Sequence, residues 1–209
     1  MISHNKGETL RYIIELLGNK GKYNIYYKVL NAVNYGVPQK RQRIFIVGVR
    51  TDIKKEFVYP EESKDIILLK NVLTNVPPSV GAKYPDKKAK IMQLIPSGGC
   101  WVDLPEEIKR EYMGKSLLSG GGKRGVARRL SMEEPCLTLT TSPCQKQTER
   151  CHPTETRPLT VREYARIQTF PDTYIFSGSI SSQYKQIGNA VPVQLAYVIA
   201  LQLKNFLNT

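Results

Sequence analysis

The sequence is poor in acidic residues, tryptophan and histidine, and it has no long apolar run. Its 209 residues include 18 Asp and Glu against 31 Lys and Arg, one Trp and two His. No segment reaches the 18 or more consecutive apolar residues of a membrane-spanning helix, and residues 1–6 lack the apolar block of a signal peptide. We therefore expect a cytoplasmic protein that has no membrane partner.

Cysteine is scarce and scattered. Cys100, Cys136, Cys144 and Cys151 contain no Cys-x-x-Cys pair, the close spacing in which zinc ligands usually occur. The sequence therefore predicts no metal site. Without a secretory signal, four reduced thiols are expected.

Basic charge, in contrast, is abundant. The formal net charge is +13, which is typical of proteins that bind a polyanion, so nucleic acid is the first partner to consider. The alternative is a charge that serves solubility alone. The 41% of hydrophobic residues and 23% of charged residues are those of an ordinary folded domain.

Hydrophobic periodicity predicts regular elements towards both ends of the chain. It indicates a helix over residues 9–17 and strands over 24–30 and 43–49, the second nearly all apolar as if covered on both faces, joined by a loop over 31–42. Further helices are predicted over 160–168, near 181–186 and from Pro192 onward; Thr160 and Glu163 have capping-box spacing. Residues 51–155 are rich in proline and glycine and predict a separate irregular module, with Trp101 and Tyr112 in its core.

Gln39, Arg41 and Arg43 alternate into the second predicted strand. In an extended chain their side chains would point the same way and place two guanidinium groups beside an amide. Such a group suits an oxygen-rich ligand. Taken alone, however, this feature is better explained by solvated arginines or general phosphate contacts.

Three sequence blocks, taken in order, change that balance. Residues 31–43 read Asn-Ala-Val-Asn-Tyr-Gly-Val-Pro-Gln-Lys-Arg-Gln-Arg, residues 157–172 read Arg-Pro-Leu-Thr-Val-Arg-Glu-Tyr-Ala-Arg-Ile-Gln-Thr-Phe-Pro-Asp, and residues 184–192 read Tyr-Lys-Gln-Ile-Gly-Asn-Ala-Val-Pro. Together they closely resemble the eighth, ninth and tenth signature blocks of bacterial DNA (cytosine-5)-methyltransferases. The resemblance spans essentially the whole chain, and three long blocks in register are far more specific than one short motif.

The resemblance implies an α/β fold, namely the carboxy-terminal part of a Rossmann-like S-adenosylmethionine-dependent methyltransferase domain. Residues 1–50 would form the second half of the catalytic domain, 51–155 an inserted, irregular and mostly β target-recognition domain, and 156–209 a bracing helix, a cofactor-side turn and a C-terminal helix. Arg41 and Arg43 would be catalytic, with Arg43 on O2 of a flipped cytosine. Asn189 and Ala190 would contact S-adenosylmethionine, and Arg162 or Arg166 would pair internally.

The resemblance also defines what the sequence does not contain. Family members carry a glycine-bearing cofactor loop, a Pro-Cys-Gln nucleophile and a Glu-Asn-Val block upstream of these elements, and none precedes Met1. Pro143-Cys144-Gln145 spells the nucleophile tripeptide but lies downstream of Arg43, so we interpret it as an ordinary thiol of the recognition module. We expect a second polypeptide to supply the catalytic cysteine and to complete the S-adenosylmethionine site.

Double-stranded DNA is the expected substrate, and its contacts are predicted at Gln39, Lys123, Arg124, Arg128 and Arg129. Most of these follow the glycine run 120–122, which lacks the spacing of a nucleotide-binding P-loop and suits a flexible basic loop close to DNA. A plain surface loop is an equal alternative.

Three functions remain open on the sequence alone. The first is a subunit of a split cytosine-5 methyltransferase, of the kind found in restriction-modification systems, that is active with its partner chain. The second is an inactive truncated fragment. The third is a freestanding sequence-specific DNA-binding module. The DNA target and the residues that read it are not identified by the sequence.

Overall fold

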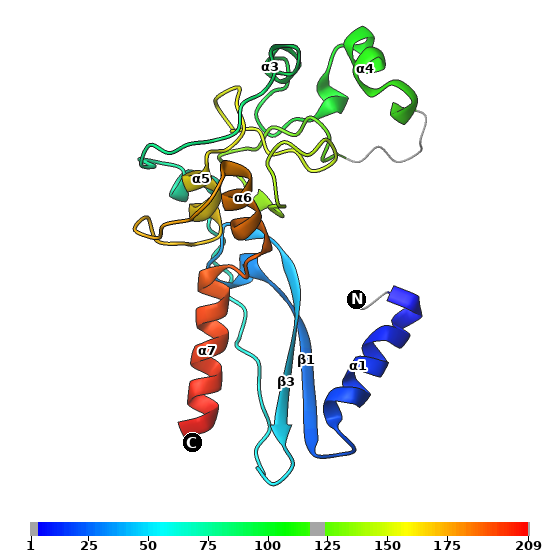
Figure 1. Ribbon diagram of the computed structural model, residues 1–209, viewed down its shortest axis with the longest axis vertical. Helices are drawn as coiled ribbons and strands as arrows, with labels where there is room; N and C mark the ends of the chain where they lie inside the picture. Colours follow the sequence, from blue (N-terminus) through cyan, green and yellow to red (C-terminus); the bar gives the residue numbers. More distant parts are fainter. Residues whose placement is uncertain (1–3, 118–123, 209) are drawn as a thin grey trace. The chain divides into compact units, whose positions relative to one another are not determined.

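The computed structural model describes residues 4–117 and 124–208 (Figure 1). The chain divides into two compact units, which we treat separately. Unit 1 comprises Met1–Asn31, Gln42–Glu62 and Tyr197–Thr209, and unit 2 comprises Ala32–Arg41 and Ser63–Ala196. This spatial division cuts across the three functional parts expected from the sequence, which stay a prediction.

Unit 1 is built on two long strands. Helix α1 (Glu8–Gly18) precedes β1 (Tyr23–Asn31), which pairs antiparallel with β3 (Gln42–Arg50) as a two-stranded ribbon (Figure 1). The predicted helix and both predicted strands are confirmed. Within β3, however, Val49 alone is buried and most of the other residues are half-exposed, so the strand is not covered on both faces in the described structure.

Phe57 is the main buried aromatic residue of unit 1. Its ring makes edge-on contacts with Tyr26, Tyr59 and Phe206, with ring centroids 6.4, 5.1 and 5.8 Å apart. The Tyr59 hydroxyl lies within hydrogen-bond distance of the carbonyls of Tyr26 and Phe45, at 3.1 and 2.9 Å. These contacts hold the segment after β3 against the ribbon.

Unit 2 has little regular strand. The predicted loop over 31–42 contains the 3₁₀ helix η2 (Ala32–Tyr35) and β2 (Gln39–Lys40), and β2 pairs parallel with β4 (Cys136–Leu137). Between residues 51 and 155, the described chain has β4 as its only named strand, together with α2 (Leu69–Val72), α3 (Asp86–Gln93), η3 (Trp101–Asp103), α4 (Glu106–Met113) and η4 (Gly114–Leu117). The prediction of a mostly β module is therefore wrong for the described residues.

The last part of unit 2 is helical. Helix α5 (Val161–Ile167) begins at the predicted capping box: the Thr160 hydroxyl accepts from the Glu163 amide and the Glu163 carboxylate accepts from the Thr160 amide. Helix α6 (Ile180–Asn189) is longer than predicted, and α7 (Val193–Asn208) follows as expected, with its residues from Tyr197 onward belonging to unit 1. The buried face of α5 packs with α6 and α2 around Tyr164, whose side chain is fully buried.

A second apolar cluster lies around α3 and α4. Its buried members include Met92, Trp101, Met113 and Cys151, and Tyr112 packs against it. The prediction that Trp101 and Tyr112 belong to the core of the module is confirmed, with Tyr112 half-buried at its edge.

One stretch, Ile180–Asn208, is long and apolar enough to cross a membrane by length and composition alone, with a mean hydropathy of 1.3. The structure divides it into α6 and α7, which are separated by three non-helical residues, 190–192. Polar residues of α6 interrupt the apolar run, which is why consecutive apolar residues did not reveal it. Helices of soluble proteins meet the same criterion, so the stretch carries no membrane assignment.

Candidate functional site

Arg41 is the centre of the site in unit 2. Its side chain is among the largest that are fully buried, and its guanidinium donates to three main-chain carbonyls: Leu139 at 2.9 Å, Gly188 at 2.8 Å and Ala190 at 3.1 Å. A planar guanidinium suits this task because its donors point outward in a fixed fork. One side chain thus joins the first sequence block, the recognition region and the third block.

Gln39 acts beside Arg41. Its side-chain oxygen accepts a hydrogen bond of 2.9 Å from the Leu139 amide, and the Thr138 hydroxyl donates to the Lys40 carbonyl at 2.7 Å. The alternation read from the sequence therefore holds for Gln39 and Arg41, which both reach Leu139. The oxygen-rich ligand that it suggested is the chain's own main chain.

Two expectations are corrected by this geometry. Gln39 is completely buried and Arg41 is 2% exposed, so neither side chain is available to DNA or to a flipped base in this structure. Arg41 is a positioning residue for the segments that it joins, rather than a catalytic contact.

The glycine at position 188 is required by close packing. A Cβ atom built there would collide with the Thr140 carbonyl, so the third block lies directly on the recognition segment. Tyr164 of α5 also donates to the Thr140 carbonyl, at 3.2 Å, and Gln168 donates to the Ile187 carbonyl at 2.9 Å. All three blocks therefore converge on residues 139–140.

Asn189 and Ala190 follow Gly188, next to the point where the three blocks meet, and both are accessible to solvent. Asn189 is exposed and Ala190 is half-exposed, while the carbonyls on either side of Asn189 are held by the same guanidinium nitrogen of Arg41. The Gly188–Asn189 and Ala190–Val191 peptide groups are thereby held in place. The Asn189 side chain is free to meet a ligand, which keeps the predicted cofactor contact as a prediction.

Arg43 belongs to unit 1. It lies on β3 opposite Leu30, is half-buried, and donates to the Gln42 carbonyl at 2.7 Å. Burial lowers the pKa of its guanidinium, but Arg remains charged at neutral pH because its ordinary pKa is so high. Its predicted role on the cytosine stays a prediction.

The predicted DNA contacts fall into three groups. Arg124 is exposed, and Arg128 is half-buried with its guanidinium 3.7 Å from the Glu134 carboxylate; both stay predictions. Lys123 lies outside the described residues. Arg129 is 5% exposed and donates to four main-chain carbonyls, those of Met92, Ile95, His152 and Glu155, and to the Thr156 hydroxyl, so its predicted DNA contact is corrected.

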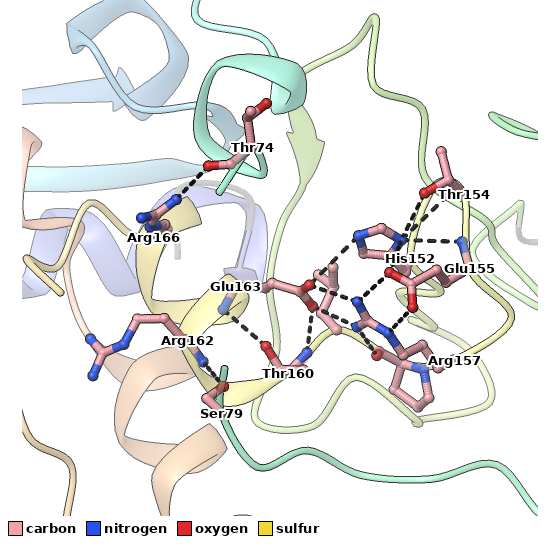
Figure 2. A network of polar contacts seen from close by, with 12 residues as sticks. Thr74, Ser79, His152, Thr154, Glu155, Arg157, Thr160, Arg162, Glu163 and Arg166 are labelled. Atoms are coloured by element: carbon pink, nitrogen blue, oxygen red, sulfur yellow. Dashed lines mark hydrogen bonds and ion pairs between the residues drawn. The ribbon is translucent and has the colours of Figure 1, made fainter. Parts of the chain in front are cut away.

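The second block forms a polar network at the start of α5 (Figure 2). Arg157 pairs with Glu163 through two hydrogen bonds of 2.8 Å and with Glu155 through bonds of 2.9 and 2.8 Å, and the His152 ring lies between the two carboxylates. Burial of Glu163 alone would raise the pKa of its carboxyl, but the Arg157 and Thr160 hydrogen bonds hold it below the usual range. Burial lowers the pKa of His152.

The other arginines of this block also serve the fold. Arg166 pairs with Asp172 and donates to the carbonyls of Val72, Thr74 and Asn75, which attaches α5 to the chain after α2. Arg162 donates to the carbonyls of Pro171 and Tyr174. The predicted internal pairing is confirmed for Arg166.

Cys144 is not in the environment of a nucleophile. It is half-buried in unit 2, and burial together with the nearby charge of Glu149 raises the pKa of its thiol to about 11. An activated cysteine needs a lowered pKa. Burial also raises the pKa of Cys136 to about 12, and no group of three metal-ligating side chains occurs among the described residues.

Sequence reasoning missed several residues of the site. Leu139 and Thr140 act through main-chain atoms, which no side-chain pattern reveals. Arg150 donates to the carbonyls of Glu149 and Thr138, and His152 completes the Arg157 network. The one available signal was that seven of the twelve arginines lie between residues 124 and 166, in a partly irregular stretch whose carbonyls need donors.

Comparison with known proteins gives consistent relatives. The chain is 55% identical over its whole length to the Type II methyltransferase M.Sau96I of Staphylococcus aureus and 50% identical to M.Eco47II of Escherichia coli, and it covers 49% and 52% of those proteins. It therefore spans about half the length of these relatives. A crystal structure of an E. coli prophage protein, described as a DNA modification methyltransferase, matches with a TM-score of 0.66 at 22% identity, over 100% of this chain and 67% of that one.

The solved structure shows the fold alone, which is the α/β fold of DNA methyltransferases. The family assignment rests on sequence. Residues 1–205 match the family of C-5 cytosine-specific DNA methylases, which includes nearly every residue described above. The chain belongs to the C-5 cytosine-specific DNA methylase family.

Proposed function

We propose that this chain is the DNA-reading and cytosine-holding portion of a DNA (cytosine-5)-methyltransferase, completed by a second polypeptide that carries the nucleophilic cysteine. The observation that carries the proposal is the Arg41 cluster, in which the first and third family blocks meet the recognition segment through Leu139, Gly188 and Ala190. The match of residues 1–205 to the family supports it.

Arg43 would act on the reacting base. Attack of a cysteine thiolate on C6 of an extruded cytosine builds negative charge on the ring, and C5 then takes the methyl group. Transfer of the C5 proton to a base and expulsion of the thiolate from C6 restore the C5=C6 double bond. A cation placed at O2 stabilises that charge. Arg43 fits this role because it is half-buried and charged, and its hydrogen bond to the Gln42 carbonyl uses one of its guanidinium nitrogens.

S-adenosylmethionine would supply the methyl group. In this chain the exposed Asn189 side chain fits one polar contact with it, while the Ala190 carbonyl is already engaged by Arg41. Arg41 keeps Asn189 oriented, and the remaining contacts would come from the second polypeptide.

Exposed apolar side chains on unit 1 support the proposal of a second polypeptide. Leu16 and Leu17 of α1 are 66% and 45% exposed, and a cavity of about 290 Å³ is lined by Leu17, Tyr23, Ile25, Ile46 and Gly48. Apolar surface of this kind is normally covered in a working protein. We propose that this surface packs against a second polypeptide that corresponds to the part of M.Sau96I outside the match to this chain.

The central experiment is a methyl-transfer assay with labelled S-adenosylmethionine and duplex DNA of mixed sequence. The full chain alone should transfer nothing. The chain mixed with the uncovered part of M.Sau96I, or with a partner encoded beside it, should transfer label, and Cys144→Ala should transfer equally well. Transfer by the chain alone that is abolished in Cys144→Ala would contradict the proposal.

Arg43 provides a specific prediction within that assay. Arg43→Ala in the active mixture should lower kcat on the order of a hundredfold, because one preorganised donor to the developing charge is lost. Arg50→Ala is the matched control, since Arg50 lies on the same strand, is exposed and pairs with Asp52. Its kcat should stay within about twofold of wild type.

A Type II restriction-modification role in the cytoplasm follows from the same proposal, by likeness to M.Sau96I and M.Eco47II. A mixture that binds DNA but transfers no label would instead favour the freestanding DNA-binding module. A mixture that neither binds nor transfers would favour an inactive fragment.

A further inference from the structure

The tripeptide Pro143-Cys144-Gln145, which the catalytic scheme does not use, lies in a compact loop formed by residues 140–150. Both ends of this loop are held in the interior of unit 2, and Pro143, Glu149 and Arg150 are buried. Its tip, Gln145, Lys146 and Gln147, is exposed. The loop therefore presents three consecutive polar side chains to solvent from an anchored base.

Hydrogen bonds within the loop fix its shape. The Thr148 amide donates to the Gln145 carbonyl at 3.0 Å, and the Thr148 hydroxyl donates to the Gln145 side-chain oxygen at 3.0 Å. The hydroxyls of Thr148 and Thr140 lie 3.2 Å apart, and the Cys144 amide donates to the Ser142 hydroxyl at 3.2 Å. The backbone is thus organised before any ligand arrives, which lowers the entropy cost of binding.

The loop is also tied to its neighbours. The buried Glu149 carboxylate pairs with Lys88 of α3 at 2.8 Å, and the Glu149 amide donates to the Gly125 carbonyl at 3.0 Å. A Cβ atom at Gly125 would collide with the Gln147 carbonyl, so two backbone segments touch there. The guanidinium of Arg150 donates to the Thr138 carbonyl at 2.7 Å, next to the Arg41 cluster.

The three tip side chains differ in the contacts that they already make within the chain. Gln145 bonds with Thr148 and Thr141, whereas Gln147 has no side-chain hydrogen bond among the described residues. Lys146 lies with its ammonium 5.9 Å from the centre of the Tyr112 ring. A free amide offers both a donor and an acceptor to a base edge, and an exposed lysine suits a phosphate.

We propose that Gln147 reads a base edge of duplex DNA, that Lys146 contacts a neighbouring phosphate, and that Pro143, Cys144 and Gln145 shape the loop that presents them. This inference rests on the proposed function, because it assumes duplex DNA as the substrate. It assigns the residues that read DNA bases, which the amino-acid sequence did not identify.

The test is selection of bound sequences from a random duplex library by the full chain, followed by competition binding. Wild type should select a fixed base at one or two positions, and Gln147→Ala should relax the choice there by about 5- to 100-fold while keeping affinity for unrelated DNA. Lys146→Ala should weaken binding to all sequences alike and reduce the slope of log affinity against log salt by about 0.9.

Gly125→Ala tests the shape of the loop without changing any of the three tip side chains. The added methyl group displaces the Gln147 backbone, so the selected sequence should be lost although the circular dichroism spectrum and the binding of unrelated DNA are retained. Gln93→Ala, an exposed glutamine at the end of α3, is the matched control and should select the wild-type sequence.

The outcomes separate the two proposals. Wild type that binds no duplex DNA, either alone or mixed with the uncovered part of M.Sau96I, overturns the proposed function and this inference with it. Wild type that binds without preference, or a Gln147→Ala variant that selects the unchanged sequence, overturns this inference alone.

Discussion

Arginine in unit 2 serves the main chain as much as it serves any ligand. Arg41, Arg129, Arg150 and Arg166 each donate to at least two main-chain carbonyls. Irregular backbone leaves carbonyls without ladder partners, and a buried carbonyl without a donor is costly. Part of the basic charge from which the sequence predicts nucleic-acid binding therefore belongs to arginines that bond to the protein's own main chain.

Arg41→Lys should lower the free energy of unfolding by about 3–5 kcal/mol. Each charge-assisted hydrogen bond contributes about 1.5–3 kcal/mol, and a single ammonium cannot reach the carbonyls of Leu139, Gly188 and Ala190 together. Urea unfolding followed by circular dichroism measures the change. Arg124→Lys, at an exposed position, should stay within about 0.5 kcal/mol of wild type; equal losses in the two variants would refute the positioning role.

At the scale of elements, α5 organises the second block because its first turn collects the polar groups around it. Thr160 and Glu163 cap each other, and Glu163 in turn holds Arg157 (Figure 2). A helix of seven residues is too short to be stable by itself, so its capping and its buried face must supply what propensity does not.

Thr160→Ala should destabilise unit 2 by about 1 kcal/mol, since the Glu163 amide loses its side-chain acceptor. Thr160→Ser keeps the acceptor oxygen and should stay close to wild type. Thermal unfolding of the three proteins measures the difference. A Ser variant as unstable as the Ala variant would show that the methyl group, and not the cap, is what matters.

The same network predicts how stability depends on pH. The ring of His152 faces Glu155 and Glu163, with Arg157 and Arg129 close by, and burial lowers its pKa below the ordinary value of about 6.5. The unfolded chain then binds a proton that the folded chain resists. This contribution to stability is complete above about pH 6.5 and is lost as the pH falls through the lowered pKa of His152.

Glu163 acts in the same direction at lower pH. Its pKa is below the usual range, so its contribution to stability is present above the unfolded value of about 4.3 and is lost as the pH falls through the folded value.

The His152 prediction is tested by urea unfolding between pH 7.5 and 5.5. The free energy of unfolding should decline in wild type and decline less in His152→Gln. An identical decline in both proteins would exclude His152 as its source.

At the scale of the whole molecule, the two units differ in how much of their apolar surface is buried. Unit 2 contains two buried apolar clusters, whereas α1 and β1 of unit 1 leave Tyr12, Leu16 and Tyr27 at least half exposed. A two-stranded ribbon is marginal on its own. Unit 1 should therefore gain most from the proposed second polypeptide.

Addition of the uncovered part of M.Sau96I at about a hundred times its Kd should stabilise the chain by about 2.7 kcal/mol, because a partner that binds only the folded state shifts unfolding by mass action. Differential scanning calorimetry measures the rise in Tm. Leu17→Glu, which places a charge in the apolar cavity of unit 1, should abolish the rise, and Lys64→Glu, at an exposed site in unit 2, should not. A rise that survives in Leu17→Glu would place the partner elsewhere.

The sequence by itself determined the features that depend on local pattern. The helix over 9–17, the strands over 24–30 and 43–49, the capping box at Thr160 and the three family blocks were all readable, because periodicity, caps and motifs act over a few neighbouring residues. The order of the family blocks also argued against Cys144 as the nucleophile, and the raised pKa of that thiol agrees.

Only the tertiary structure decided which of the basic and polar residues face inward. Gln39, Arg41 and Arg129 look like ligand contacts in the sequence but are buried against the main chain, the two arginines on carbonyls and Gln39 on the Leu139 amide. Leu139 is about a hundred residues away from Gln39 and Arg41 along the chain. The tertiary structure also replaced the expected β module by short helices and irregular chain. The reason is physical: a main-chain carbonyl has no signature in the sequence, so the partner that it gives to an arginine appears only once the chain is folded.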